Sequence, residues 1–413
     1  MGPFGSDIKV ENFVSEGVPV LNGSNLDGFK LSENKFKYVT KEKAKTFKKA
    51  IASRGDIVIT HRGTLGQMSF IPENSKHAAY VISQSQFRVR LKTIRALPSF
   101  FVYYFHTPEG QRRLLAYKNH VGVPALAQAT TNFRQIEIPL PILDVQKKIA
   151  KILLSLDDKI HLNNRINTEL EAMAKTLYDY WFVQFNFPDA KGKPYKTSGG
   201  KMVWNEVLKR EIPKGWEVKS LLDIADFTNG LACQKFRPTI GGAALKVIKI
   251  RDMKDGFSSE PEWVRADIPS KVVINNGDVL FSWSASLEVI LWSGGIGALN
   301  QHIFIVTSST YPKSFFYFQV LNYLQHFKMM AEIRKTTMGH ITQEHLQQSK
   351  VAVPPVALTM QLDKLISPIL NKQIASQVEN HSLAALRDWL LPMLMNGQVR
   401  VRWADSSTKC TDR

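Results

Sequence analysis

The stretch Gly55-Asp56-Ile57-Val58 recurs in the second half of the chain as Gly277-Asp278-Val279-Leu280. In both places a glycine and an aspartate precede a run of apolar residues. This pattern is typical of a turn that leads into a buried strand. A single four-residue match carries little weight on its own.

Further matches occur in the same order on both sides of this stretch. The matched segments are residues 20–21 with 247–248, 98–101 with 312–316, 126–128 with 341–343, and 138–141 with 351–354. Gln146 then matches Gln361. A collinear series of this kind indicates two diverged copies of one unit.

The parts follow the same order in each copy. The β-branched and aromatic segments predicted as strands are residues 55–59, 69–71 and 86–91 in the first copy, and 246–250, 278–283 and 302–306 in the second. A helix is then predicted over residues 98–118 and 312–334. A short loop, a strand and a proline-containing hinge lead from this helix into a long helix.

The two long helices carry apolar residues spaced alternately by four and three, which is typical of a coiled-coil seam. The predicted seam residues are Ile149, Leu153, Leu156, Ile160, Leu170 and Leu177 in the first helix, and Leu362, Leu365, Ile369, Leu383, Leu386 and Leu390 in the second. The middle of each seam is polar, with Asn163 and Asn167 in the first helix and Lys372, Ser376 and Glu379 in the second. Antiparallel pairing would bring the two polar middles together. The alternative is that each helix packs only on its own β domain.

The predicted fold class is α+β, with two pseudo-repeated mixed α/β domains separated by two long antiparallel coiled-coil helices. The predicted segments are a first domain (1–142), a first long helix (143–187), a connector (188–211) that glycines and prolines mark as a loop, a second domain (212–355), a second long helix (356–397) and a tail (398–413). Residues 213–230 of the second copy have no counterpart in the first. The first domain is therefore expected to be shortened at its beginning, unless another part of the chain supplies this element.

The chain has a net charge of +18 and an isoelectric point of about 9.7. Residues 1–142 hold 20 Lys and Arg against 10 Asp and Glu, so most of the excess lies in the first domain. This favours a polyanionic partner, although a soluble basic surface is the alternative.

No apolar run approaches the ~20 residues of a membrane span, and no signal peptide is recognisable. Two distant cysteines, Cys233 and Cys410, argue against a disulfide framework or a zinc site, so we expect a cytoplasmic protein without membrane contact.

The ordered set of motifs resembles the specificity subunit of type I restriction-modification systems over nearly the whole chain. The segments that carry this resemblance are 212–218 (Ile-Pro-Lys-Gly-Trp-Glu-Val), the two Gly-Asp stretches, the two proline-containing exits into the long helices, and 383–397. The resemblance implies that each domain is a target-recognition domain for one half of a split double-stranded DNA target. It also implies that the helices set the gap between the halves and dock two modification subunits.

The same resemblance assigns the chemistry to other subunits. Modification subunits would methylate adenine with S-adenosylmethionine, and restriction subunits would translocate and cleave DNA with ATP and Mg²⁺. The chain itself is then expected to be non-catalytic and to hold no cofactor.

Three groups of residues are candidates for DNA contact. Lys41, Lys43, Lys45, Lys48 and Lys49 are candidates for phosphates, with a solvated helix face as the alternative. The polar residues that follow the central strands are candidates for contacts with bases: His61, Arg62 and Thr64 in the first copy, and Ser282, Trp283 and Ser284 in the second. Arginine, for example, can donate two hydrogen bonds to guanine. The alternative role for Arg62 is a surface ion pair, and the alternative role for Trp283 is a position in the hydrophobic core. The third group lies in the loops before the last strands, where an ordinary turn is the alternative: Lys118, Asn119 and His120, and Lys335, Thr336, Thr337 and His340.

Two apparent catalytic motifs do not fit the predicted domains. Asp189 with Glu217 and Lys219 imitates a magnesium-dependent nuclease site, but Asp189 lies in the connector. The glycines at 294–297 lack the helix and acidic partner of a methyl-donor site. A stand-alone sequence-specific endonuclease is the alternative function, and a scaffold that ignores DNA is a third.

Overall fold

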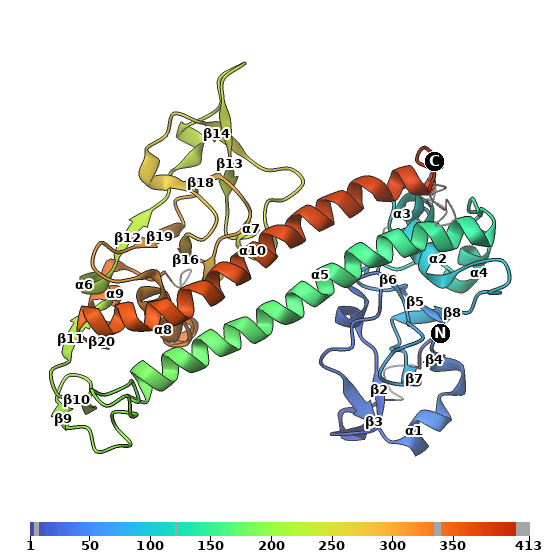
Figure 1. Cartoon of the computed structure of the whole chain (residues 1–413). Helices are drawn as coiled ribbons and strands as arrows, with labels where there is room; N and C mark the ends of the chain where they lie inside the picture. The colour runs from blue at the N-terminus through green and yellow to red at the C-terminus, as the bar shows by residue number, and fades with distance from the viewer. Residues whose placement is uncertain (4–7, 120–122, 334–339, 402–413) are drawn as a thin grey trace, which may run out of the picture. The chain divides into compact units, whose positions relative to one another are not determined.

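The computed structural model describes residues 1–3, 8–119, 123–333 and 340–401. The chain divides into two compact units (Figure 1). Unit 1 comprises Met1–Asp158 and Ala384–Arg413, and unit 2 comprises Lys159–Leu383. Two long helices, α5 (Leu143–Tyr178) and α10 (Val356–Met395), each contribute one end to either unit.

Unit 1 contains two small sheets. The first has the order β1-β3-β2-β7-β4, with β1 at Phe13–Val14, β2 at Val18–Val20, β3 at Lys37–Val39, β4 at Ile51–Ser53 and β7 at Ala79–Val81. The second has the order β6-β5-β8, with β5 at Ile57–Thr60, β6 at Met68–Phe70 and β8 at Gln86–Val89. The helices are α1 (Lys41–Thr46), α2 (Pro98–Phe105), α3 (Pro108–Leu115) and α4 (Ala129–Arg134).

Unit 2 repeats this plan and contains further strands. One sheet has the order β14-β13-β18-β15, with β13 at Ala244–Ile248, β14 at Trp263–Arg265, β15 at Val273–Ile274 and β18 at Gly297–Leu299. The other has the order β12-β19-β16-β17, with β12 at Asp226–Asn229, β16 at Val279–Ser282, β17 at Glu288–Leu291 and β19 at Ile303–Thr307. A separate pair joins β11 (Glu217–Ser220) to β20 (Lys350–Val353). The helices are α6 (Leu221–Ile224), α7 (Asp252–Asp255), α8 (Lys313–Ile333) and α9 (Gln343–Gln348).

Equivalent strands pair in the same sense in the two units. The parallel pair of β2 with β7 corresponds to that of β13 with β18, and the antiparallel pairs around β5 correspond to those around β16. The predicted duplication and fold class are therefore confirmed.

The repeated Gly-Asp stretch forms the turn into the central strand of each unit. Gly55 and Gly277 adopt φ values of +80° and +90°, which glycine tolerates best. The Asp56 carboxylate accepts the Ser53 N–H at 2.9 Å, and the Asp278 carboxylate accepts the Asn275 N–H at 2.8 Å. The motif thus fixes where β5 and β16 begin, and both strands are fully buried.

Three predicted elements differ in the structure. The strand expected before the first long helix does not form at residues 138–141, whereas its counterpart β20 forms in unit 2. The single helix predicted over residues 98–118 is two helices, because Pro108 lacks an N–H and Thr107 caps a new start by accepting the Gly110 N–H at 3.0 Å. The connector, predicted as a loop, contains a hairpin of β9 (Met202–Asn205) and β10 (Arg210–Pro213). The carboxamide of Asn205 accepts two N–H groups in its turn, and Lys209 adopts a φ of +49° there.

In unit 1, the start of α5 packs against the end of α10. Ile149 and Leu153 share a buried cluster with Leu391 and Leu394. Next to this cluster, the Asp157 carboxylate and the Arg387 guanidinium form an ion pair at 2.8 Å.

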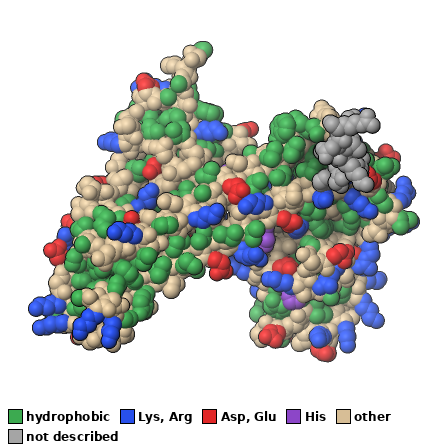
Figure 2. All heavy atoms as spheres, viewed as in Figure 1, with side chains coloured by type: hydrophobic (Ala, Val, Ile, Leu, Met, Phe, Trp, Pro, Cys, Tyr) green, Lys and Arg blue, Asp and Glu red, His purple; other side chains and the backbone are tan. Residues whose placement is uncertain are grey.

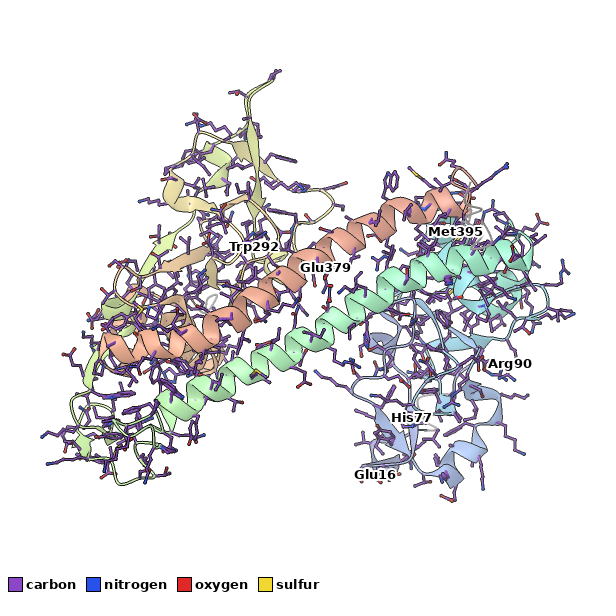
Figure 3. All side chains as sticks on the ribbon, viewed as in Figure 1. Glu16, His77, Arg90, Trp292, Glu379 and Met395 are labelled. Atoms are coloured by element: carbon purple, nitrogen blue, oxygen red, sulfur yellow. The ribbon has the colours of Figure 1, made fainter. Side chains whose placement is uncertain are left out.

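In unit 2, the end of α5 and the start of α10 contribute side chains to one buried cluster, and the polar middles of the two helices meet as predicted. The Asn163 amide donates to Glu379 at 2.8 Å and to Asn380 at 2.9 Å, and the Asn380 amide donates to Asn164 at 2.8 Å. Glu379 points toward α5 in Figure 3. The hydrogen bond from Asn163 is the main cause that lowers the pKa of Glu379. Polar contacts of this kind fix the register of paired helices.

The seam predicted on α10 is wrong at two positions. Leu365 and Leu386 are 49% and 43% exposed, whereas Leu362, Ile366 and Leu370 are buried. An unstrained helix has 3.6 residues per turn, so its buried face drifts away from a strict 3.5-residue repeat over many turns. The buried residues of α10 follow this drift.

Candidate nucleic-acid interface

In unit 1 the end of the central strand meets two loops. The His61 N–H donates to the Ser85 carbonyl at 2.8 Å, and the Leu126 N–H donates to the His61 carbonyl at 2.8 Å. The Asn119 N–H donates to the Ala125 carbonyl at 2.8 Å. The loop after β5, the turn before β8 and the segment before α4 therefore lie side by side.

Unit 2 builds the same junction. The Trp283 N–H donates to the His302 carbonyl at 3.3 Å, and the Ile341 N–H donates to the Trp283 carbonyl at 2.9 Å. Trp283 thus occupies the place of His61, His302 that of Ser85, and Ile341 that of Leu126. We refer to this meeting of three segments as the junction of each unit.

The side chains at the two junctions differ. In unit 2 the Trp283 indole N–H donates to Asn229 at 2.9 Å, and its ring lies 5.5 Å from His302 and 5.3 Å from His340. In unit 1 the His61 ring contacts the Gln84 carbonyl at 3.1 Å. Burial is the main cause that lowers the pKa of His61, which favours the neutral ring. The two junctions thus share one backbone arrangement but present different hydrogen-bond donors and acceptors.

Most of the described candidates at the junctions are accessible. Arg62, Thr64, Lys118 and Asn119 are exposed in unit 1, and His340 is exposed in unit 2. Arg62 pairs through its backbone with Ala125, which leaves its side chain toward solvent. Trp283 is half-buried and packs against the edge of the hydrophobic core, so its side chain also helps to stabilise the fold. His120, Lys335, Thr336 and Thr337 lie outside the described residues.

Two of the predicted residues are part of the hairpin that supports the junction in unit 2. Ser282 is fully buried, and its hydroxyl donates to the Ser286 carbonyl at 2.6 Å and accepts the Glu288 N–H at 2.8 Å. Ser284 is only 4% exposed. Because their side chains are inside the protein, we correct these two assignments and exclude both residues from the candidate contacts.

The sequence analysis missed the polar residues of the turn before the last strand of each sheet. Gln84 is exposed in unit 1, and Gln301 and His302 are half-buried in unit 2. The Gln301 amide lies 3.2 Å from the His302 ring. A signal was present, because Gln84-Ser85-Gln86-Phe87 aligns with Gln301-His302-Ile303-Phe304 once the duplication is recognised.

The lysine cluster of the first domain lies on α1 and the turn after it. Lys41, Lys45, Lys48 and Lys49 are exposed, while Lys43 is half-buried with its ammonium 5.4 Å from the Phe47 ring centre. Thr40 caps the helix by accepting the Lys43 N–H at 3.1 Å. Figure 2 shows Lys and Arg side chains along the outer margin of the part that carries α1. The positive charge of this cluster would attract the negatively charged phosphates of DNA.

The residues of the apparent nuclease motif serve the fold instead. The Asp189 carboxylate accepts the N–H groups of Lys191 and Lys193, both at 2.8 Å, and so closes a turn of the connector. Glu217 pairs with Lys219 at 2.9 Å on the strand β11. Among the residues that the structure describes, no group of three His, Cys, Asp or Glu side chains is placed to hold a metal ion. Nor does any helix within the described ranges have the length and apolar character to cross a membrane.

Comparison with known proteins gives consistent results. The type I restriction modification DNA specificity domain matches residues 7–172 and 213–386. The type I restriction enzyme MjaIX specificity subunit of Methanocaldococcus jannaschii is 25% identical over 374 residues, which cover 88% of this chain and 82% of that protein. The HindI specificity subunit of Haemophilus influenzae is 23% identical over 409 residues, which cover 85% and 88%.

A solved structure shares the fold. The crystal structure of the type I restriction-modification S subunit from M. genitalium has a TM-score of 0.55 and 14% identity, and the match covers 96% of this chain and 92% of that one. At this identity the likeness shows the fold alone. The family assignment rests on the two matched domains, which together cover well over half of the chain. The predicted resemblance is confirmed, and this chain belongs to the type I restriction-modification DNA specificity family.

Proposed function

We propose that this chain reads a split DNA target, with one half-target recognised at the junction of each unit. The observation that carries the proposal is that the same three backbone segments meet in both units and present different side chains. Base edges in the major groove are distinguished by their pattern of donors and acceptors, so two different junctions suit two different half-targets.

The long helices would connect the two readers and bind the modification subunits. Both helices carry large apolar side chains that are exposed in the free chain, and such residues are typical of protein-binding surfaces. They are Leu162 and Met173 on α5, and Leu365, Leu386 and Trp389 on α10. Leu365 and Leu386, which the heptad pattern placed in the seam, are therefore better candidates for partner contact.

The chain would contribute recognition and no catalysis. S-adenosylmethionine would be held by the modification subunits, and ATP and Mg²⁺ by restriction subunits where these are present. Consistent with this division, the two carboxylates of the apparent nuclease motif are engaged in a turn and in a strand ion pair.

We expect the lysine cluster to contribute affinity without sequence preference. Replacing Lys41, Lys45, Lys48 and Lys49 by alanine should lower the salt dependence of DNA binding, by about 0.9 in the slope of log K against log salt for each phosphate that the variant no longer neutralises. A matched variant that replaces Lys191, Lys193, Lys196 and Lys201 in the connector loses the same charge and should keep the parental slope. Equal slopes for the two variants would show that only the net charge matters. Titration of duplex DNA at several salt concentrations, with the chain in its methyltransferase complex, measures both slopes.

The proposed function is tested by the methylation pattern that the chain directs. The chain is co-expressed with its cognate modification subunit in a host without DNA methylation, and N6-methyladenine is mapped by sequencing. We expect a motif of two parts separated by a gap of fixed length. A one-part or symmetric motif would contradict the assignment of one half-target to each unit. Absence of methylation from a complex shown to be assembled would contradict DNA reading altogether.

A further inference from the structure

A groove of about 470 Å³ lies on unit 2, where the end of α5, the hairpin of β9 and β10, the helix α8 and the strand β20 meet (Figure 1). All of its lining residues belong to unit 2, and none of them takes part in the junction. Its volume is within the range of small-molecule sites in proteins. The lining combines aromatic rings, a glutamine amide and basic side chains, so it suits a ligand that has both an aromatic part and a negative charge.

The amide of Gln319 lines this groove without a partner. Gln319 is only 9% exposed, and its side chain makes no hydrogen bond to any residue that the structure describes. A buried amide is normally paired, and it can donate and accept hydrogen bonds at the same time. The amide is therefore placed to bind a polar group that enters the groove.

Two further polar atoms, on the side of the groove that the end of α5 forms, also lack partners among the described residues. They are the hydroxyl oxygen of Tyr178, which is 1% exposed, and one carboxylate oxygen of Asp179. The other Asp179 oxygen accepts from the Lys175 ammonium at 2.6 Å. Burial is the main cause that raises the pKa of Tyr178, so its hydroxyl keeps its proton and remains a donor. A ligand that carries both an acceptor and a donor would pair these atoms.

The basic side chains of the groove outnumber the acidic ones. Lys175 is paired with Asp179, whereas Arg210 and Lys350 form no ion pair within the described part of the chain. The Arg210 guanidinium donates to the Val183 carbonyl at 3.2 Å, which leaves most of its donors unused. Arginine and lysine are the side chains that bind phosphate groups in proteins. Two uncompensated cations in one groove thus favour an anionic ligand.

The backbone beside Arg210 is held in an unusual conformation. Phe185, whose ring centre lies 4.6 Å from the Arg210 guanidinium, is 2% exposed and adopts a φ of +63°, which bulky side chains rarely do. The π-helical turn Asp179–Val183, a conformation that is frequent at functional sites, directly precedes this segment. Residues held in sparsely populated conformations cluster at ligand-binding sites. The local backbone is therefore consistent with a site at which the guanidinium is held in place for a ligand.

We propose that this groove binds a nucleoside monophosphate, with the phosphate at Arg210 and Lys350 and the base at Gln319. The side chains of Phe182 and Tyr323 line the same groove and provide apolar contact for the base. An inorganic anion would leave the amide without a partner, and a neutral nucleoside would leave both cations without one. Each half of the ligand should therefore contribute to its affinity.

Calorimetric titration of the full chain with AMP, GMP, CMP and UMP is the test. We expect at least one of them to bind saturably, and about tenfold or more tightly than inorganic phosphate or the corresponding nucleoside, because each of these lacks one set of hydrogen bonds. Absence of saturable binding by all of these nucleotides would overturn the proposal, since the groove would then hold only water. Equal affinities for phosphate and nucleotide would overturn it as well, because the amide would then recognise nothing.

Variants of the chain locate the bound nucleotide. Gln319→Leu and Arg210→Gln should each weaken binding about tenfold, because each removes hydrogen bonds to the ligand. The matched controls are Gln325→Leu, at an exposed position of α8, and Lys209→Gln, whose side chain is 73% exposed next to Arg210; both should bind as the parental chain does. The thermal transition of each variant shows whether it is folded, and the exposed Arg210 provides the decisive variant if Gln319→Leu is not. Folded groove variants that bind the nucleotide as tightly as their controls would place it elsewhere on the chain and refute the assignment.

Discussion

Replacing Gln84 by alanine is expected to relax one half of a split methylation motif and to leave the other half unchanged, and replacing Gln301 should do the converse. The two glutamines hold equivalent places in the turns before β8 and β19. The Gln84 carbonyl contacts the His61 ring, and the Gln301 amide contacts the His302 ring, which lies beside Trp283. A glutamine amide can donate to and accept from adenine at the same time. Removing such an interaction costs about 1–3 kcal/mol, so specific binding should fall by about 5–150-fold while non-specific binding stays the same.

The measurement is the methylation motif of each variant complex, together with the affinity for duplexes altered in one half-target. Each glutamine variant is the control for the other, because both remove the same group from equivalent turns. Gln348→Ala, at an exposed position of α9, should change neither half. If Gln84→Ala and Gln301→Ala relaxed the same half, the assignment of one half-target to each unit would be refuted.

The duplication made most of the fold predictable. Gly55-Asp56 and Gly277-Asp278 fix equivalent turns, and the order of matched segments then fixes equivalent strands. What failed were local features that depend on packing. The drift of the buried face of α10 exposes Leu365 and Leu386, and Pro108 divides a helix that is continuous in unit 2.

The candidate site was less predictable, because three segments distant in sequence create it. The residues directly after β5 and β16 could be named from the strand pattern. Gln84 and Gln301 align across the duplication, but the alignment does not place them at the junction. Their turns reach it through the hydrogen bonds that the Ser85 and His302 carbonyls accept from His61 and Trp283. Ser282 illustrates the converse error, because alternation along a strand does not reveal that both faces are buried.

The second large effect that we expect concerns stability, and it centres on Asp157. The side chains of Asp157 and Arg387 are only 14% and 19% exposed, and their ion pair joins α5 to α10 within unit 1. The Tyr103 hydroxyl donates to the same carboxylate, and burial, followed by the charge of Asp157, raises the pKa of this tyrosine. The Arg387 guanidinium also lies 5.0 Å from the ring centre of Phe29. One carboxylate therefore satisfies a cation and a hydroxyl that are both mostly inside the protein.

Asp157→Ala should lower the free energy of unfolding of unit 1 by about 3–5 kcal/mol. It leaves the mostly buried Arg387 with the Phe29 ring and the carboxylate of Asp388, which is 63% exposed, and it removes the acceptor of the Tyr103 hydroxyl. Asp158→Ala is the matched control. Its carboxylate is 61% exposed and pairs with Lys30 at the surface, so the loss should be below about 1 kcal/mol. Calorimetry of the full chain resolves the transition that the Asp157 variant shifts.

A second variant separates the loss of a charge partner from a simple loss of packing. Asp157→Leu combined with Arg387→Met and Tyr103→Phe removes the three mostly buried polar side chains and keeps a similar volume, while the exposed Asp388 stays in place. Since apolar groups can replace a buried ionic cluster at little cost, this triple variant should be more stable than Asp157→Ala alone. If the triple variant were as unstable as Asp157→Ala, the instability would be caused by lost packing at this position and not by the unpaired charge. If Asp157→Ala had no effect beyond that of Asp158→Ala, solvent would already be screening the pair, and the packing of α5 on α10 in unit 1 would rest on Leu153, Leu391 and their apolar neighbours.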